Sequence, residues 1–353
     1  MSRAPAPRPG VRDVEPYVSP QPPAAVRLNA NECPRPLPAG FSEDLARAVR
    51  DLPLNRYPDG QMTRLREDLA AHVGHTFEGT WTANGSNEIL TELLLAYGGP
   101  GRTAAVFEPT YMLHPRLAAL TSTALTSLRL DDPFVISDRA IGEAAAADPD
   151  VVFVCSPNNP TGNSQPPASM RALAETVDAL VIVDEAYVEF GGDTALELIA
   201  DHPNVVVTRT LSKAFALAGA RIGYCLAAPE VVQDLQRVRL PYHMSALTQA
   251  AGIAALRHAP EALAILDAIR AQRDRIVGAL GAIPGLTVYP SDANFVLFMP
   301  PPHRDAAEVW QALLDRGVLV RDLTTVVPRA LRVTAGTEDE TTQFLDALTE
   351  VLS

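Results

Sequence analysis

The strongest constraint on the fold is a series of short, unbroken apolar runs in the first two thirds of the chain. Each run is bounded by turn residues, and together they are TAAVFE at 103–108, VVFVCS at 151–156, LVIVDEA at 180–186, VVVTRT at 205–210 and RIGYCLA at 221–227. Residues 63–73 and 87–97 carry apolar side chains at helical spacing. Apolar runs that alternate with helices are typical of buried, largely parallel strands. We therefore predict an α/β fold with a mostly parallel central sheet flanked by helices.

After Leu240 the pattern changes to a long helical stretch, which is followed by short strands with a helix between them. These strands are expected at TVYP, ANFVLF, VLVRD and ALRVTAG. The pattern predicts a second, smaller α+β domain, and 353 residues give room for two domains. We expect an N-terminal arm and part of the small domain over 1–44, a large domain over 45–240 and a small C-terminal domain over 241–353.

Composition excludes several classes of function. A net charge of -13 argues against a nucleic-acid surface, and no apolar run reaches the ~18 residues that a membrane span needs. The proline-rich N-terminal stretch lacks the apolar core of a signal peptide, so we expect a cytoplasmic protein. Cys33, Cys155 and Cys225 are widely separated and lack CxxC spacing, so neither a disulfide framework nor a metal site is expected.

The cationic residues are distributed unusually: of 29 lysines and arginines, Lys213 is the single lysine. Arginine serves surface charge, ion pairs and phosphate recognition, but it stays protonated and cannot attack a carbonyl. A lone lysine can also be a solvated remnant in an arginine-rich chain. Its position in TLSKAFALAGARIGY, beside hydroxyl, glycine and arginine residues, makes Lys213 a candidate for Schiff-base formation with a pyridoxal aldehyde.

Two segments have the residues that bind a phosphate group. In ANGSNE, Gly85 allows a close backbone approach and the following amides open a helix, although such a turn can also be an ordinary helix cap. Around the lysine, Thr210 and Ser212 offer hydroxyls and Arg221 a guanidinium, and a phosphate dianion would use all three.

Other polar residues follow the predicted strands, and in a parallel sheet these ends form the ligand site. Asp184 ends a buried strand, where a carboxylate needs a partner such as a protonated pyridine nitrogen. Tyr187 is placed to donate a hydrogen bond to a ring oxygen, Tyr111 to stack on a flat cofactor, and Asn158 to end a strand in a proline-rich turn. Packed core tyrosines and a tight loop are the alternatives.

Taken together, these motifs resemble those of the fold-type I pyridoxal-phosphate aminotransferases over nearly the whole chain. SPNNPTG, DEAY and SKAF at these intervals are specific for that superfamily. The chain looks like its histidinol-phosphate branch, through RLPYHMSALTQAA and the pair VRD and LRVT. The remaining matching blocks are EPYVSP, RLNANE, NRYPDG, ANGSNEIL and SDANFVLF.

The resemblance implies pyridoxal 5'-phosphate as cofactor and a role for each matching residue. Lys213 would form the Schiff base and shuttle a proton between the substrate and the cofactor. Asp184 would pair with the ring nitrogen, Asn158 and Tyr187 with the ring oxygen, and Tyr111 would stack on the ring. The phosphate would be held by Ser86, Asn87, Thr210, Ser212 and Arg221, and by Tyr57 reaching across the interface of a homodimer.

Three further residues are implied in substrate binding. Arg332 resembles the arginine that grips the carboxylate of glutamate and the phosphate of histidinol phosphate, with Arg321 and Tyr17 as its companions. The implied reaction moves an amino group, through pyridoxamine phosphate, from glutamate to imidazole-acetol phosphate and gives histidinol phosphate and 2-oxoglutarate.

Alternatives with the same cofactor are an aromatic amino-acid aminotransferase and a decarboxylase of a phosphorylated amino acid. NECPRP and YMLH depart from the usual family pattern near the expected substrate pocket. A transcription regulator built on this fold is disfavoured, because the segment before RLNANE is too short and proline-rich for a DNA-binding module.

Overall fold

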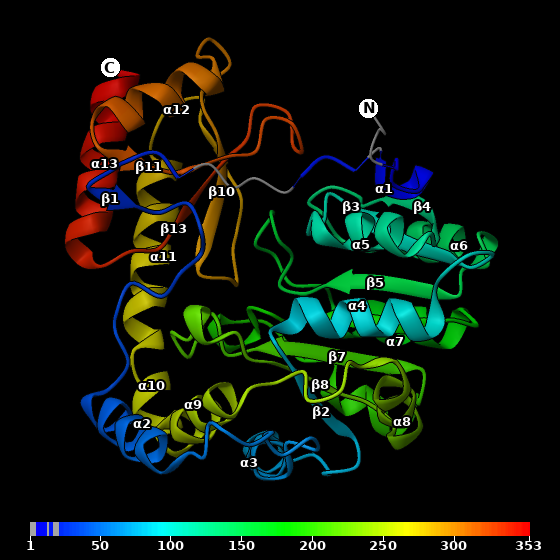
Figure 1. The fold of residues 1–353 in the computed structure, drawn as a ribbon. Helices are drawn as coiled ribbons and strands as arrows, with labels where there is room; N and C mark the ends of the chain where they lie inside the picture. The colour runs from blue at the N-terminus through cyan, green and yellow to red at the C-terminus, as the bar shows by residue number, and fades with distance from the viewer. Residues whose placement is uncertain (1–4, 13, 17–20) are drawn as a thin grey trace.

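A large mixed β-sheet forms the centre of the computed structural model, which describes residues 5–12, 14–16 and 21–353 (Figure 1). Over these residues the large sheet has seven strands in the order β2-β8-β7-β6-β5-β3-β4. Strands β3 to β7 are mutually parallel, whereas β8 runs antiparallel to both of its neighbours. The strands are β2 Thr80–Ala83, β3 Thr103–Glu108, β4 Ala124–Arg129, β5 Val151–Cys155, β6 Leu180–Asp184, β7 Val205–Thr210 and β8 Gly223–Leu226.

The central strands β5 and β6 are buried along their whole length, which explains their continuous valine and isoleucine runs. Helix α4 packs against β2, β7 and β8, and α5 packs against β3 and β4. The helices of this region are α4 Ser86–Tyr97, α5 Leu113–Thr121, α6 Asp138–Ala146, α7 Pro167–Thr176 and α8 Pro229–Val238, with short 3-10 turns η1 Val188–Phe190, η2 Leu196–Ala200 and η3 Ala218–Ala220. The predicted α/β architecture with a mostly parallel central sheet is confirmed.

Two strands of the large sheet have no counterpart among the expected apolar runs. Strand β2 is the four-residue TWTA, and β4 is ALTSLR, in which Leu128 is the buried side chain. Both lie at the edges of the sheet: β2 is buried but has only four residues, two of them threonines, whereas β4 is mostly exposed or half-buried. Edge strands of this kind lack the hydrophobic pattern that marks central strands.

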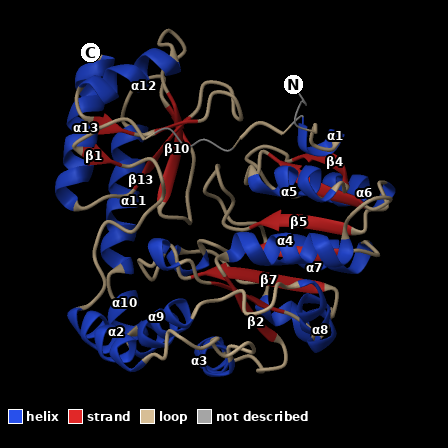
Figure 2. Ribbon diagram, viewed as in Figure 1, coloured by secondary structure: helices blue, strands red, loops and turns tan. Residues whose placement is uncertain are grey.

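Residues from both ends of the chain form two smaller sheets (Figure 2). Among the described residues, one has the order β12-β13-β10-β9 and the other pairs β1 with β11 in parallel. The strands are β1 Val26–Arg27, β9 Thr287–Val288, β10 Phe295–Met299, β11 Val318–Leu319, β12 Arg321–Asp322 and β13 Leu331–Thr334. Helices α11 Leu266–Gly281, α12 Ala306–Asp315 and α13 Glu338–Leu352 pack against them.

The remaining helices connect the two regions. Helix α9 packs against both α2 and α3. These helices are α2 Ala39–Asp51, α3 Thr63–Val73, α9 Ala246–Arg257 and α10 Ala259–Leu263, and α1 Pro9–Arg12 contacts α5. Domain boundaries near residues 44 and 240 remain a prediction. Within the described part of the chain, no helix combines the length and apolar character required to cross a membrane.

Candidate active site

A cavity of about 310 Å³ lies between the large sheet and the small sheets. One wall comes from the carboxyl ends of β5, β6 and β7, where Cys155, Asp184 and Thr210 lie, and from the start of α4. The opposite wall is formed by residues 29–32, which follow β1, and by residues of β12 and β13. The position agrees with the rule that ligands bind at the carboxyl ends of parallel strands.

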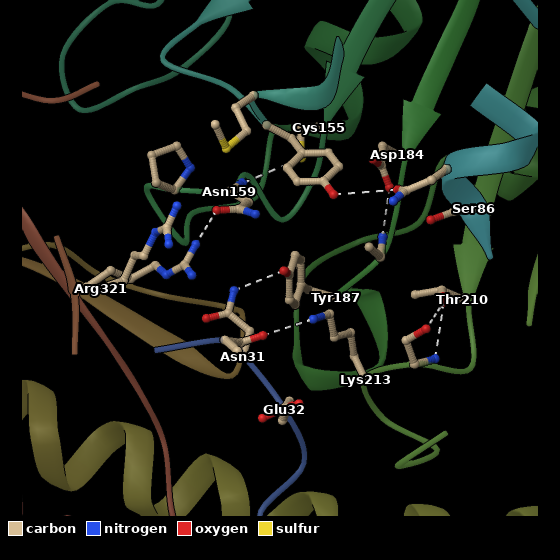
Figure 3. A pocket seen from close by; sticks show the side chains of 18 of the residues that line it. Asn31, Glu32, Ser86, Cys155, Asn159, Asp184, Tyr187, Thr210, Lys213 and Arg321 are labelled. Atoms are coloured by element: carbon tan, nitrogen blue, oxygen red, sulfur yellow. Dashed lines mark hydrogen bonds between the residues drawn. The ribbon is translucent and has the colours of Figure 1, made fainter. Parts of the chain in front are cut away.

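The amine of Lys213 is held inside this cavity (Figure 3). Its Nζ donates a hydrogen bond to the carbonyl oxygen of Ala30 at 3.3 Å and lies 5.7 Å from the centroid of the Tyr187 ring. Burial, with the positive charges of Arg332 and Arg221, lowers the pKa of Lys213 to about 8, while Glu32 acts in the opposite direction. An appreciable fraction of this amine is therefore uncharged near neutral pH and is nucleophilic.

Asp184 is a buried carboxylate at the end of β6, with a partner that the sequence did not indicate. Its Oδ2 lies 3.1 Å from Nε2 of His114, and its Oδ1 accepts from the amide of Ala186 at 3.2 Å. The imidazole of His114 is itself buried, stacked on Phe153 with ring centroids 4.7 Å apart. This histidine holds the orientation of the carboxylate. Because 70 residues separate His114 from Asp184, no local sequence motif predicts this pair.

Tyr187 projects into the cavity near Lys213 and is fixed by Asn31. The Nδ2 of Asn31 donates to the phenol oxygen at 2.9 Å, while the Oδ1 of Asn31 accepts from Thr334 at 3.2 Å. Burial raises the pKa of Tyr187 to about 12, so its hydroxyl keeps a proton to donate.

Polar groups at one end of the cavity form an anion cradle. Ser86 and Asn87 begin helix α4, where free backbone amides and the helix dipole favour a negative charge. The Oγ1 of Thr210 donates to the Oγ of Ser212 at 2.8 Å, and Nη1 of Arg221 approaches the same Oγ at 3.4 Å. Hydroxyls, amides and a guanidinium thus converge, a donor set suited to a phosphate dianion.

Two glycines make the close approach of these elements possible. A Cβ added to Gly223 in β8 would overlap the amide nitrogen of Ser86, and one added to Gly85 would overlap the guanidinium of Arg221. Gly85 also has a φ of 86°, a left-handed conformation that favours glycine. The cradle therefore requires these positions to lack side chains.

Two arginines occupy the other end of the cavity. Arg321 of β12 and Arg332 of β13 are antiparallel register partners, so the strand pairing brings them side by side. Arg332 donates to the Oδ1 of Asn159 and to the carbonyl of Asn29, and its guanidinium lies 4.9 Å over the ring of Phe295. Figure 3 shows Arg321 across the cavity from Ser86 and Thr210, with Lys213 and Tyr187 between. The cavity thus has a second cationic end.

The structure brings together most of the residues chosen from the sequence. Those that line the cavity are Ser86, Asn87, Tyr111, Asp184, Tyr187, Thr210, Ser212, Lys213, Arg221, Arg321 and Arg332. Tyr57 is 80% exposed and is not among the residues of this cavity. Tyr17 lies outside the described residues.

Asn158 is the residue whose position differs from the one expected. Its side chain is buried in the loop, where Nδ2 donates to the carbonyl of Pro109 and to Thr161, each at 2.8 Å. The next residue, Asn159, lines the cavity instead. The side chains of Asn158 and Asn159 point in opposite directions, so Asn159 is the one placed to make the contact with the cofactor ring that was expected of Asn158.

The described cysteines Cys33, Cys155 and Cys225 are free thiols. Burial raises the pKa of each, most strongly for Cys155 and Cys225, so they are poor thiolate nucleophiles. No group of three or more histidine, cysteine or acidic side chains in the described ranges is arranged to hold a metal ion.

Comparison with known proteins agrees with this geometry. The model of the aminotransferase class I and II family matches residues 23–348. A histidinol-phosphate aminotransferase of Frankia casuarinae is 47% identical over 98% of this chain and 90% of its own length. One from Streptomyces avermitilis is 48% identical over 97% of this chain and 95% of its own. The structure of the Sinorhizobium meliloti histidinol-phosphate aminotransferase in complex with pyridoxal-5'-phosphate superposes with a TM-score of 0.87 and 25% identity, covering 98% of this chain and 97% of that one.

The chain therefore belongs to the class I and II aminotransferase family, the class that its fold and cavity define. Within that family, the two relatives named above are histidinol-phosphate aminotransferases, matched over 90% and 95% of their own length. The resemblance seen in the sequence motifs is confirmed.

Proposed function

We propose that this enzyme transfers an amino group between glutamate and imidazole-acetol phosphate, giving L-histidinol phosphate and 2-oxoglutarate in histidine biosynthesis. The two curated relatives described above are named histidinol-phosphate aminotransferases, which supports histidinol phosphate as one of the substrates. The observation that carries the proposal is the pair Arg321 and Arg332, which gives the cavity a second anion site opposite the phosphate cradle. A substrate with its own phosphate uses such a site.

The residues of the cavity fit pyridoxal 5'-phosphate as cofactor. The anion cradle of Ser86, Asn87, Thr210, Ser212 and Arg221 would receive its phosphate, and the glycines at 85 and 223 leave the room that this requires. When bound, the cofactor supplies an aldehyde for amines and a ring that accepts electrons from the substrate carbon.

Residues around the ring position control where protons and charge reside. Asp184, held by His114, would keep a proton on the ring nitrogen. Tyr187 and Asn159 would donate hydrogen bonds to the ring oxygen, and Tyr111 would cover one face of the ring.

Lys213 would attach the cofactor and then act as general base and acid. Its lowered pKa, near 8, lets the amine take a proton from the α-carbon of the substrate and return it during transfer. A lysine that stayed fully protonated in this position could accept no proton.

One cationic pocket would serve both substrates in turn. Arg332 would bind the α-carboxylate of glutamate and the phosphate of histidinol phosphate, with Arg321 as an additional ligand for the phosphate. Guanidinium groups suit both anions because they donate two parallel hydrogen bonds. Tyr17 would be a third contact to this phosphate.

We also propose a homodimer located in the cytoplasm. Tyr57 is too exposed to serve its own cavity, and in a dimer it would reach the cofactor phosphate of the partner subunit. The three unpaired cysteines suit a reducing compartment.

The substrate is tested with purified protein, glutamate and a panel of keto acids, with identification of the aminated product. We expect imidazole-acetol phosphate to be aminated fastest. Arg321→Ala should raise KM for histidinol phosphate by about tenfold or more, because a charge-assisted contact is lost, and change KM for phenylalanine much less. Equal effects on both, or preferred amination of an aromatic keto acid, would favour an aromatic aminotransferase, and release of carbon dioxide would indicate a decarboxylase.

A further inference from the structure

Four large apolar side chains are exposed on two loops outside the cavity. Leu54 and Tyr57 belong to the loop before α3, and Leu240 and Tyr242 belong to residues 239–245, here called the strap, between α8 and α9. The exposed fractions are 80% for Tyr57, 72% for Leu240 and 48% for Tyr242. Exposed side chains of this size on adjoining loops indicate a contact surface.

The two tyrosines form an ordered pair on this surface. The rings of Tyr57 and Tyr242 are stacked, with centroids 4.5 Å apart and planes 13° from parallel. A Cβ on Gly60 would touch the Tyr242 ring at 3.4 Å, so the loop backbone also lies against that ring. Tyr242 has a φ of 52°, which residues with side chains rarely adopt. The backbone of the strap is therefore held in an uncommon conformation that places this ring beside Tyr57.

Hydrogen bonds lock the strap and the Tyr57 loop together. Nη1 of Arg239 donates to the carbonyl of Gly60 at 2.8 Å. Nε2 of Gln249, in α9, donates to the carbonyls of Asp59 and Met244 at 3.0 and 3.1 Å. The carboxylate of Asp59 in turn accepts from the first turn of α3. The base of Tyr57 is thus rigid, whereas its ring has no other stacking partner among the described residues.

The strap also contacts the segment that leads into the anion cradle. Nδ2 of Asn84 donates to the carbonyl of His243 at 2.8 Å, and Nε2 of His243 lies 3.2 Å from the carbonyl of Thr82. The imidazole of His243 is stacked on Trp81 with centroids 5.7 Å apart. Since Asn84 immediately precedes Gly85 and the start of α4, one strap fixes both the cradle of its own subunit and the position of Tyr57.

We propose that Tyr242 is a positioning residue, which orients Tyr57 by ring stacking for contact with the cofactor phosphate of a second copy of this chain. The inference rests on the proposed dimer and the role of Tyr57 in it. Without the stack, the Tyr57 ring would sample several rotamers, and binding in the partner would have to order it. Stacking against the Tyr242 ring removes this rotamer freedom of Tyr57 before the cofactor binds in the dimer.

The test measures the dissociation constant of pyridoxal 5'-phosphate by equilibrium dialysis, with the dimer checked by sedimentation. We expect Tyr242→Leu to raise this constant about threefold to tenfold, as loss of an aromatic stack predicts, with the dimer intact. Tyr242→Phe keeps the ring and should behave as the parent protein. Leu240→Ala, which removes a still more exposed apolar side chain from the same strap, should have no such effect.

A double-mutant cycle separates positioning from an independent role. In a Tyr57→Ala background, Tyr242→Leu should cause no further loss of cofactor affinity, because the side chain it positions is gone. An undiminished effect in that background, or an equal loss from Leu240→Ala, would overturn the proposal. If Tyr57→Ala alone left cofactor binding unchanged, the contact across the dimer and this inference would both fail, whereas the aminotransferase assignment would stand on Lys213.

Discussion

Replacing Lys213 by methionine should stabilise the cofactor-free protein at neutral pH, although it abolishes activity. Burial and the neighbouring arginines lower the pKa of Lys213 from 10.5 to about 8. A difference of one in pKa between folded and unfolded states corresponds to about 1.4 kcal/mol. The protonated amine therefore costs the folded state about 3 kcal/mol below pH 8. Methionine has a similar length and carries no charge, so this cost disappears.

The stabilisation by Lys213→Met should decrease as the pH rises. The unfolded chain keeps the lysine proton up to about pH 10.5, whereas the folded protein releases it near pH 8. Between these values the unfolded state binds more protons, so the stability of the parent protein rises with pH. The advantage of Lys213→Met should be full below pH 8 and should vanish by about pH 10.5.

Urea denaturation of both cofactor-free proteins between pH 7 and pH 10.5 measures this advantage as a difference in the free energy of unfolding. Lys213→Arg is the matched control, because arginine stays charged throughout the range and should bring no stabilisation at pH 7. A difference between the methionine variant and the parent that stays constant across the range would refute the reasoning.

Two further predictions concern the walls of the cavity. Gly223→Ala places a methyl group on the amide of Ser86 and should weaken binding of pyridoxal 5'-phosphate about tenfold or more. Gly219→Ala is the control, because Gly219 has open space around it, and this variant should bind the cofactor normally. Equilibrium dialysis measures both affinities. Asn159→Ala, which changes a side chain lining the cavity, should lower kcat/KM with little change in melting temperature. Asn158→Ala should instead lower the free energy of unfolding by about 1 to 3 kcal/mol, because buried groups of the loop lose their hydrogen-bond partners. Loss of activity from Asn158→Ala and loss of stability from Asn159→Ala would contradict the structure.

The central strands and the cofactor end of the cavity were predictable from the sequence. Strands β5, β6 and β7 each begin with a continuous apolar run that the fold buries, so these strands were recognisable in the sequence. Lys213 stood out because its chemistry cannot be replaced by arginine. Both the apolar runs and the single lysine can be recognised from short stretches of sequence.

The features that the sequence did not predict depend on the direction in which a side chain points and on contacts between residues far apart in the chain. Asn158 and Asn159 are chemically identical, and only the path of the turn decides which one faces the cavity. His114 reaches Asp184 through the pairing of strands and the packing of α5, neither of which a motif records. The stack of Tyr57 on Tyr242 likewise requires two loops 185 residues apart to meet.

The claim that Lys213 is the residue bearing the cofactor can be measured directly. The holoenzyme is reduced with sodium borohydride, which makes a Schiff base permanent, and its peptides are mapped by mass spectrometry. Because the chain has no other lysine, the competing amine is the N-terminus. We predict one pyridoxyl group per chain, on the peptide that contains Lys213. A pyridoxyl group on the N-terminal peptide, or none at all in a protein that still turns over substrate, would contradict the account.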